Sequence, residues 1–502
     1  MKKTYLILAL AVGLVSSCSM DTEPLGSLPE SEATKTPEDF TSLRNGLYSA
    51  LRISVGGDNF NTPIDVQGDQ FHATSLNSNT LGDFYRWDFT TQNDYVGTVY
   101  ANYQGTIARA NVIIDGYNKC DMSDETVFTP DAMTTVRQAK GDAFFARAYS
   151  IFMLSQYFCA DYEKETADEP NSGVSYRTDY APSSNPSTYP ARKTLKETMK
   201  QVKDDLDSAA YYLEPIAPAN FYYVTMDAIT ALRARLALAM GEYKTAADYA
   251  ASLVDGGIYM LANGTSEIKE MWADNGDMET IMQMQIGGST DQYPATSGSY
   301  YLLINDNVDF VPTKTLVDLY SPGDRRFDAY FTKINVVNSV GASATVYGFN
   351  KYPAATRLYQ ENTSNSTRSL IEPKVFRIAE MYLIAAEGYA QSDDLTKAAY
   401  YLNELERNRI ANYADQTFAS REAAMQEIMR ERQREMVGEG TRMFDLKRWH
   451  MALERGEAQD ESILGFTASS YITQPANANR MTWPIPKNET DLASQIVQNP
   501  GY

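Results

Sequence analysis

Apolar residues recur every three to four positions through two long parts of this chain, residues 96–255 and 375–455. This period places their side chains on one face of an α-helix. Alanines occupy the positions where paired helices of the tetratricopeptide type approach most closely, namely Ala234, Ala246, Ala250, Ala386 and Ala398. The pattern predicts a mainly α fold with a tetratricopeptide-like scaffold of helix pairs. We expect no tandem array, because the two parts are far apart in the sequence.

Residues 257–374 break the helical period between these parts. A Gly-Gly pair ends the preceding helix, and in residues 279–286 apolar residues alternate with polar ones, as in a β-strand. Residues 287–305 form a loop dense in Gly, Ser and Tyr. We therefore predict a large irregular insert with short β-strands. Long irregular inserts often carry function, so we expect this one to bind ligand.

The N-terminus predicts an exported lipoprotein. Two lysines precede an apolar run that is too short to span a bilayer, and the sequence Val-Ser-Ser then leads to Cys18. This arrangement is similar to a lipoprotein signal-peptidase site; an ordinary signal peptide with an incidental cysteine is the alternative. We predict a signal peptide over residues 1–17, lipidation of Cys18, a tether over residues 18–37 and a helical domain over residues 38–502. No later apolar run is long enough to cross a membrane.

The composition and the motifs present narrow the range of possible functions. The formal net charge is -21 and the pI is about 4.6, which argues against a nucleic-acid ligand. His72, in a polar loop, and His450, expected at the surface or a helix end, belong to no HExxH motif. No nucleophile elbow or phosphate-binding glycine loop is present either. We therefore predict no catalytic residue, cofactor or metal site. A glycosidase carboxylate pair stays open, because it is defined by a separation in space.

The two remaining cysteines are expected to be free thiols. Cys120 and Cys159 each lie at the end of a predicted helix. If these helices are antiparallel neighbours, the two ends point in opposite directions, which keeps the thiols apart.

Residues 421–449 carry the most specific pattern. A helical apolar stripe contains Arg432, whose burial would require carboxylate partners. The nearby carboxylates are Glu431, Glu435, Glu439 and Asp445. Glycines end this helix, and a second helix follows with Met443, Leu446, Trp449 and Leu453 on one face. On a neighbouring face, Arg442, Asp445 and Arg448 are spaced so that they can pair.

This stretch resembles the C-terminal signature of SusD/RagB-type lipoproteins. The resemblance continues at residues 377–387, 402–404, 483–486 and 498–502. It implies a helical-pair scaffold and a lipid-anchored, surface-exposed protein of the outer membrane. Such a protein would capture oligosaccharides and deliver them to a TonB-dependent β-barrel transporter, on which it would sit as a lid. A peptide cargo is the alternative within the family. The alternatives from other classes are a surface glycoside hydrolase and a tetratricopeptide scaffold for protein partners.

Aromatic residues beside hydrogen-bonding residues are the candidate ligand contacts. Sugars present apolar C–H faces and hydroxyl edges, which Trp and Tyr rings with polar neighbours match. One candidate group is Arg86, Trp87, Asn93 and Tyr95; the other is Trp272, Tyr293, Tyr300 and Tyr301. For each ring, packing in the core is the alternative interpretation.

Overall fold

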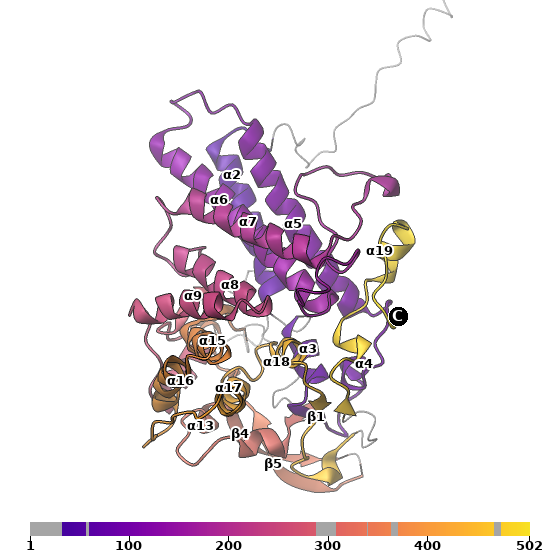
Figure 1. The fold of residues 1–502 in the computed structure, drawn as a ribbon, viewed down its shortest axis with the longest axis vertical. Helices are drawn as coiled ribbons and strands as arrows, with labels where there is room; N and C mark the ends of the chain where they lie inside the picture. Colours follow the sequence, from indigo (N-terminus) through magenta and orange to yellow (C-terminus); the bar gives the residue numbers. More distant parts are fainter. Residues whose placement is uncertain (1–32, 57–59, 288–307, 339, 363–369, 466–472) are drawn as a thin grey trace, which may run out of the picture.

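The computed structural model describes residues 33–56, 60–287, 308–338, 340–362, 370–465 and 473–502. Helices dominate this part of the chain, and the strands within it are short and lie in small sheets (Figure 1). The prediction of a mainly α, tetratricopeptide-like fold is therefore confirmed. The predicted signal peptide, Cys18 and most of the tether lie outside the described residues, as do Tyr293, Tyr300 and Tyr301.

A first group of helices occupies one end of the molecule's long axis (Figure 1). Its members are α2 (Pro37–Val55), α5 (Asp94–Lys119), α6 (Pro130–Phe158) and α7 (Leu195–Leu213). Each helix is preceded by a capping residue whose side chain accepts a hydrogen bond from a backbone N–H of the first turn. These capping residues are Thr36, Asn93, Thr129 and Thr194. Helix α6 packs against both α5 and α7, and α2 lies across α5 and α6.

A second group brings together the helices with close-packing alanines. It contains α8 (Met226–Ala239), α9 (Tyr243–Asp255), α15 (Ile378–Gln391), α16 (Leu395–Arg409) and α17 (Arg421–Glu435). Helices α9 and α15 are in extensive contact although more than a hundred residues separate them. Ala246, Ala250, Ala386 and Ala398 are all fully buried. The small side chains therefore allow two distant helix pairs to stack on each other.

Within the described residues, the strands form four two-stranded antiparallel sheets. They pair as β1 (Phe71–Ala73) with β3 (Phe310–Pro312), β2 (Thr280–Gln283) with β6 (Lys374–Arg377), β4 (Phe331–Val337) with β5 (Ser343–Phe349), and β7 (Leu453–Glu454) with β8 (Thr473–Gln474). The β4–β5 hairpin lies at the end of the molecule opposite the first helix group (Figure 1). Strand β2 falls within the alternating residues 279–286 and pairs with the strand that leads into α15.

Short helices complete the described fold. They are α3 (Asn61–Gln67), α4 (Gly82–Tyr85), α10 (Thr265–Trp272), α12 (Lys314–Asp318), α13 (Phe327–Tyr330), α14 (Arg357–Asn362), α18 (Arg442–Arg448) and α19 (Lys487–Leu492). Residues 54–95, around the polar loop expected at His72, contain α3, β1 and α4. The predicted helix through Leu453 is too long: α18 ends at Arg448, His450 adopts a left-handed φ of 51°, and Leu453 lies in β7.

The C-terminal segment closes the fold against α6. The Trp483 ring packs against Tyr157 with ring centroids 4.9 Å apart. The Asn499 side chain donates to the carbonyl oxygens of Phe158, at 2.8 Å, and Trp483, at 2.7 Å. Cys120 and Cys159 are free and follow the C-terminal ends of α5 and α6, as predicted. Among the described residues, no helix combines the length and apolar character needed to span a membrane.

Candidate functional site

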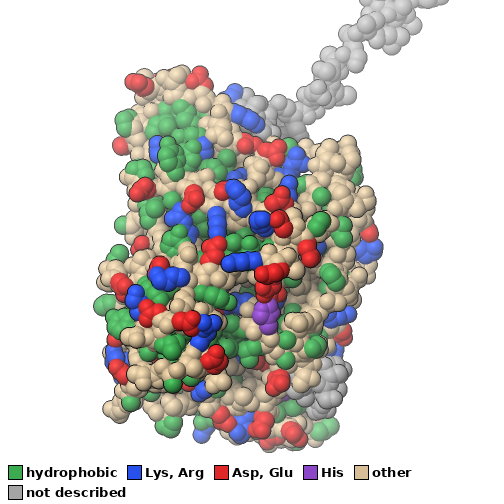
Figure 2. Space-filling model, in the orientation of Figure 1, with side chains coloured by type: hydrophobic (Ala, Val, Ile, Leu, Met, Phe, Trp, Pro, Cys, Tyr) green, Lys and Arg blue, Asp and Glu red, His purple; other side chains and the backbone are tan. Residues whose placement is uncertain are grey.

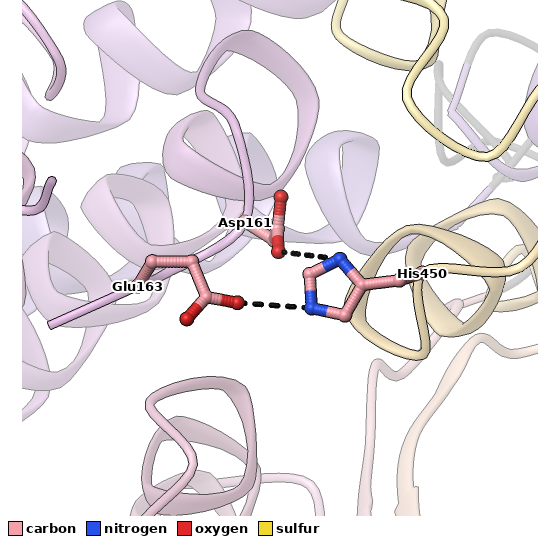
Figure 3. Close-up of side chains that lie close together, drawn as sticks. All are labelled: Asp161, Glu163 and His450. Carbon is pink, nitrogen blue, oxygen red and sulfur yellow. Dashed lines mark ion pairs between the residues drawn. The ribbon is translucent and has the colours of Figure 1, made fainter. Parts of the chain in front are cut away.

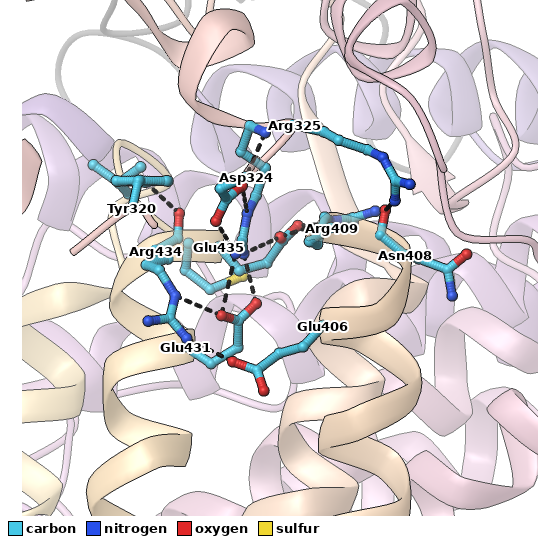
Figure 4. Close-up of polar contacts among 12 residues, drawn as sticks. Tyr320, Asp324, Arg325, Glu406, Asn408, Arg409, Glu431, Arg434 and Glu435 are labelled. Carbon is cyan, nitrogen blue, oxygen red and sulfur yellow. Dashed lines mark hydrogen bonds and ion pairs between the residues drawn. The ribbon is translucent and has the colours of Figure 1, made fainter. Parts of the chain in front are cut away.

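Arg432 is buried, and its carboxylate partner is Asp445: Nε donates to Oδ2 at 2.7 Å. The other nearby carboxylates bind different arginines, and a buried network results. Glu435 lies within 3.0 Å of Arg326, Arg377 and Arg409, whose side chains are at most 1% exposed. Glu431 pairs with Arg326 and Arg434, and Figure 4 shows its contact with Arg434. These charges hold the fold together and are inaccessible to a ligand.

The first predicted ligand group lies around α4 and the start of α5. Asn93 caps α5. The side chains of Asn93 and Arg86 both donate hydrogen bonds to the carboxylate of Asp83. The Tyr95 ring is half-buried and packs edge-on against Phe84, with centroids 5.9 Å apart. Trp87 is 3% exposed, and its indole N–H donates to the carbonyl oxygen of Gln67 at 3.0 Å. The structure brings these four residues together but turns the Trp87 ring into the core.

Trp272 lies elsewhere, in the wall of an interior cavity. Its ring is 2% exposed, meets Tyr352 edge-on, and faces the ammonium of Lys351 at 4.5 Å from the ring centroid. Its indole N–H has no hydrogen-bond partner in the described part of the chain. Both rings are therefore packed in the core: ligand contact by Trp87 would require the core to open, and Trp272 could be met only by a ligand inside the cavity.

The interior cavity has a volume of about 130 Å³ and lies between α6, α8, α15, α17 and α18. Its walls combine apolar side chains with charged ones that already pair across it. Arg235 contacts Glu380 at 2.6 Å, and Asp445 accepts from Arg432 and, at 2.9 Å, from Arg448. The opposite charges in its wall therefore balance, and the cavity offers no strong preference for a charged ligand.

A second hollow, open to solvent, is lined by tyrosines. We call it the tyrosine hollow; it has a volume of about 300 Å³ and is lined by Asn45, Tyr48, Ser49, Arg52, Tyr222, Tyr223, Met284, Gln285 and Gly287. Three segments supply these residues: α2, the connection from α7 to α8, and the chain after β2. Gly287 is the first residue of the predicted Tyr-rich loop, and the rest of that loop lies outside the described residues.

Buried carboxylates hold two of these tyrosines in place. The Tyr48 hydroxyl donates to Asp142 at 2.9 Å and accepts the Val224 N–H at 2.9 Å. The Tyr222 hydroxyl donates to Glu372, whose other oxygen accepts the Ile286 N–H at 3.0 Å. Glu372 also lines the interior cavity, so it stands between the two hollows. Rings fixed in this way lose little conformational entropy when a ligand binds.

Electrostatics keep these phenols neutral. Desolvation by burial and the neighbouring Glu372 raise the pKa of Tyr222 to about 12, and burial raises the pKa of Tyr48 well above its ordinary value. The Tyr223 ring lies edge-on to Tyr48, with centroids 5.4 Å apart, and the Arg44 guanidinium lies 4.8 Å from its centroid. No described residue bonds the Tyr223 hydroxyl, so it remains available to a ligand. The hollow thus offers ring faces and neutral hydroxyls.

Sequence reasoning did not single out Tyr48, Tyr222 or Tyr223. Tyr48 lies next to Leu47 of the α2 apolar stripe, and the Phe-Tyr-Tyr run at residues 221–223 was a signal that could have been weighed. His72 is buried on β1 rather than in an open loop, whereas His450 is exposed at the end of α18, as predicted. In the described residues, one set of side chains has the composition of a metal site: Asp161, Glu163 and His450.

Comparison with protein families matches two models. Residues 326–502 match the model described as the SusD family, and residues 21–238 match the model described as "Starch-binding associating with outer membrane". Together the two matches cover residues 21–238 and 326–502, which include most of the helical scaffold. No curated protein sequence matches the chain.

Solved structures share the fold over nearly the whole chain. A SusD superfamily protein from Bacteroides thetaiotaomicron is 23% identical, with a TM-score of 0.76, and the match covers 93% of this chain and 100% of that one. A putative sugar binding protein from Bacteroides vulgatus is also 23% identical with a TM-score of 0.76, covering 94% and 99%. A SusD-like carbohydrate binding protein from Bacteroides vulgatus is 17% identical with a TM-score of 0.74, covering 92% and 97%.

Proposed function

Because the chain belongs to the SusD/RagB family, we propose that it is a nutrient-binding protein that captures oligosaccharides at its surface. The observation that carries this proposal is the tyrosine hollow. Half-buried phenol rings match the C–H faces of sugar rings, and neutral hydroxyls match their hydroxyl edges. The names of related structures, a sugar binding protein and a carbohydrate binding protein, agree with it.

Glycan binding is tested by affinity electrophoresis of the purified protein on a panel of polysaccharides. We expect retardation by at least one glycan, and calorimetry with an oligosaccharide of that glycan then gives the affinity. Tyr222→Ala and Tyr223→Ala should each weaken binding about tenfold or more, because each removes a ring that the ligand covers. Tyr400→Ala, which removes a 53% exposed ring on α16, is the control and should bind normally.

Two results would contradict the proposal. If both hollow variants bind like the parent protein, the glycan lies elsewhere. If no polysaccharide retards the protein while peptide digests bind, the cargo is peptide.

We further propose that the protein binds and delivers its cargo without cleaving it. The fully buried carboxylates Glu435 and Glu431 are engaged by arginines, which leaves these two unsuited to proton transfer. The purified protein should therefore release no reducing sugar from the glycan that it binds. Sustained release of reducing sugar would identify a glycoside hydrolase instead.

The remaining parts of the proposal concern location and partner. We propose a lipid anchor on Cys18, outer-membrane attachment at the cell surface, and delivery of cargo to a TonB-dependent β-barrel transporter. The family model described as associating with the outer membrane supports the location. Labelled palmitate should enter the parent protein and not a Cys18→Ala variant. A β-barrel should co-purify from membranes; its repeated absence under mild detergent would contradict the partnership.

A further inference from the structure

A group of ligand-type side chains lies away from both hollows, where the segment after α6 meets the end of α18. Asp161 and Glu163 are two positions apart in a segment without helix, so their side chains can point to the same side. His450 lies two residues beyond α18. Figure 3 shows both carboxylates directed at the imidazole of His450. In Figure 2, a histidine is visible at the surface with acidic side chains beside it.

The distances show that the imidazole contacts both carboxylates. Nε2 of His450 lies 2.9 Å from Oε1 of Glu163, and Nδ1 lies 3.5 Å from Oδ2 of Asp161. A neutral imidazole carries one N–H and can donate to only one of them. The second ring nitrogen would then direct its lone pair at a carboxylate, which is unfavourable. A cation at this place, either a proton or a metal ion, removes that repulsion.

No neighbouring cation in the described part of the chain forms a direct ion pair with these carboxylates. Among the described residues, no lysine or arginine forms an ion pair with Asp161 or Glu163. The ammonium of Lys447, close by on α18, is held by the carbonyl oxygens of Gln156, at 2.6 Å, and Cys159, at 2.9 Å. Its charge acts on Asp161 from a distance, but no lysine or arginine of the described residues occupies the space between the two carboxylates and the imidazole.

We propose that Asp161, Glu163 and His450 form a surface site for a divalent transition-metal ion of the Zn²⁺ class. One imidazole nitrogen with two carboxylate oxygens is a donor set that suits zinc, whereas calcium and magnesium prefer oxygen alone. One ligand atom from each of the three residues lies within 4.8 Å of the others. Bonds of about 2.0–2.2 Å to zinc need ligand atoms about 3.3–3.6 Å apart, so small side-chain rotations complete the site.

The exposure of the side chains permits these rotations. His450 is 51% exposed, Glu163 48% and Asp161 23%. A bound ion would join the segment that follows α6 to the end of α18, which lie nearly 300 residues apart in the sequence. It would therefore cross-link the first helix group to the C-terminal part of the chain, and its binding should raise Tm.

The test is calorimetric titration of ZnCl₂ into the full protein purified without a polyhistidine tag. We expect one ion per chain, and an affinity at least about tenfold lower for His450→Ala. Asp161→Asn and Glu163→Gln should also weaken binding. Glu165→Gln, an exposed carboxylate two residues further along, is the matched control and should bind like the parent. CaCl₂ should produce no comparable signal.

Histidine-ring NMR locates the ion directly, because the chain has only two histidines and His72 is buried. Zinc should shift the His450 resonances and leave those of His72 unchanged. The proposal is overturned if His450→Ala binds zinc as tightly as the parent, or if the His450 resonances do not respond. The cluster would then be a surface contact among the three side chains without an ion. The glycan-binding test uses different residues, so either result leaves it unaffected.

Discussion

At the scale of single residues, His72 shows how burial sets the charge of a side chain. It is 4% exposed on β1, and its Nε2 faces the carbonyl oxygen of Gly456 at 2.7 Å. A carbonyl oxygen only accepts, so Nε2 carries the proton and Nδ1 accepts from the Tyr85 hydroxyl at 3.2 Å. Desolvation by burial is the main cause that lowers the pKa of His72 to about 4, and nearby Arg455 contributes. The folded state therefore holds this imidazole neutral.

This pKa predicts a loss of stability in mild acid. The unfolded chain takes up a proton near pH 6.5, whereas the folded chain does so only near pH 4. The stability from neutral His72 is thus fully present above about pH 6.5 and is lost as the pH falls towards 4. Between pH 7 and pH 5, this group should lower the free energy of unfolding by about 2 kcal/mol.

Urea unfolding at pH 7, 6 and 5 measures this effect. His72→Gln should lose less stability between pH 7 and pH 5 than the parent protein, because glutamine does not titrate. Tyr400→Ala, which alters only an exposed ring, should retain the parent dependence on pH. An unchanged dependence in His72→Gln would show that other groups cause the acid sensitivity.

At the scale of elements, the close contact between α9 and α15 requires a glycine, which has no side chain, at one position of α15. Gly388 lies on α15 and faces the start of α9. A Cβ atom there would lie 2.4 Å from the carbonyl oxygen of Tyr243 and 2.9 Å from the Cβ of Ala247. Both atoms belong to or adjoin the backbone, so neither can move aside without displacing the helix.

Gly388→Ala should therefore destabilise the protein. Overpacking of a tight contact costs about 1–3 kcal/mol, which exceeds the gain of about 0.5–1 kcal/mol from replacing a helical glycine. Gly46→Ala on α2 is the matched control, because a Cβ atom there meets nothing within 4 Å. Thermal unfolding should give a lower Tm for Gly388→Ala and an equal or higher Tm for Gly46→Ala. A Gly388→Ala protein as stable as the parent would mean that the helices separate without cost.

At the scale of the whole molecule, the buried charge network joins segments from most of the second half of the chain. Arg326 comes from the insert, Arg377 from β6, Arg409 from α16 and Glu435 from the end of α17. Glu279, just before β2, accepts from Arg377 at 2.9 Å and from Arg409 at 2.7 Å. Although burial acts in the opposite direction, the three arginines hold the pKa of Glu435 well below its ordinary value.

Glu435→Gln should strongly destabilise the whole fold. It removes the negative charge shared by three buried guanidinium groups, and breaking one partner of a buried pair costs about 3–5 kcal/mol. Asp415→Asn breaks an exposed pair with Arg407 and should cost about 1 kcal/mol or less. Chemical denaturation of the two variants gives the comparison. Similar losses in both would show that the network contributes no more than a surface pair.

The helical scaffold could be predicted because its signals are local. The period of apolar residues depends on helix geometry alone, and the buried alanines of α9, α15 and α16 lie where that period placed them. The strand at residues 279–286 was visible for the same reason, and β2 occupies part of it. The C-terminal pattern at residues 421–449 gave α17 and α18, although α18 is shorter than predicted.

The ligand surface could not be predicted in the same way. In residues 54–95, no regular period shows which side of the chain faces inward, so the burial of Trp87 depends on contacts with distant segments. The tyrosine hollow combines α2 with residues 222–223 and 284–287, and no local pattern relates them. The tertiary structure also determines which carboxylate each arginine pairs with. Arg432 pairs with Asp445, whereas Arg326, Arg377 and Arg409 share Glu435.

By itself, the sequence determined that this chain is helical and that its helices pack through small residues, because both properties follow from side-chain spacing along one helix. It also carried the patterns that identify the family. Only the tertiary structure decided which aromatic rings reach solvent and which charges meet, because these depend on segments hundreds of residues apart meeting at one place. Packing of the whole molecule buries some groups away from water and leaves others exposed to it, so no single segment determines which groups are buried.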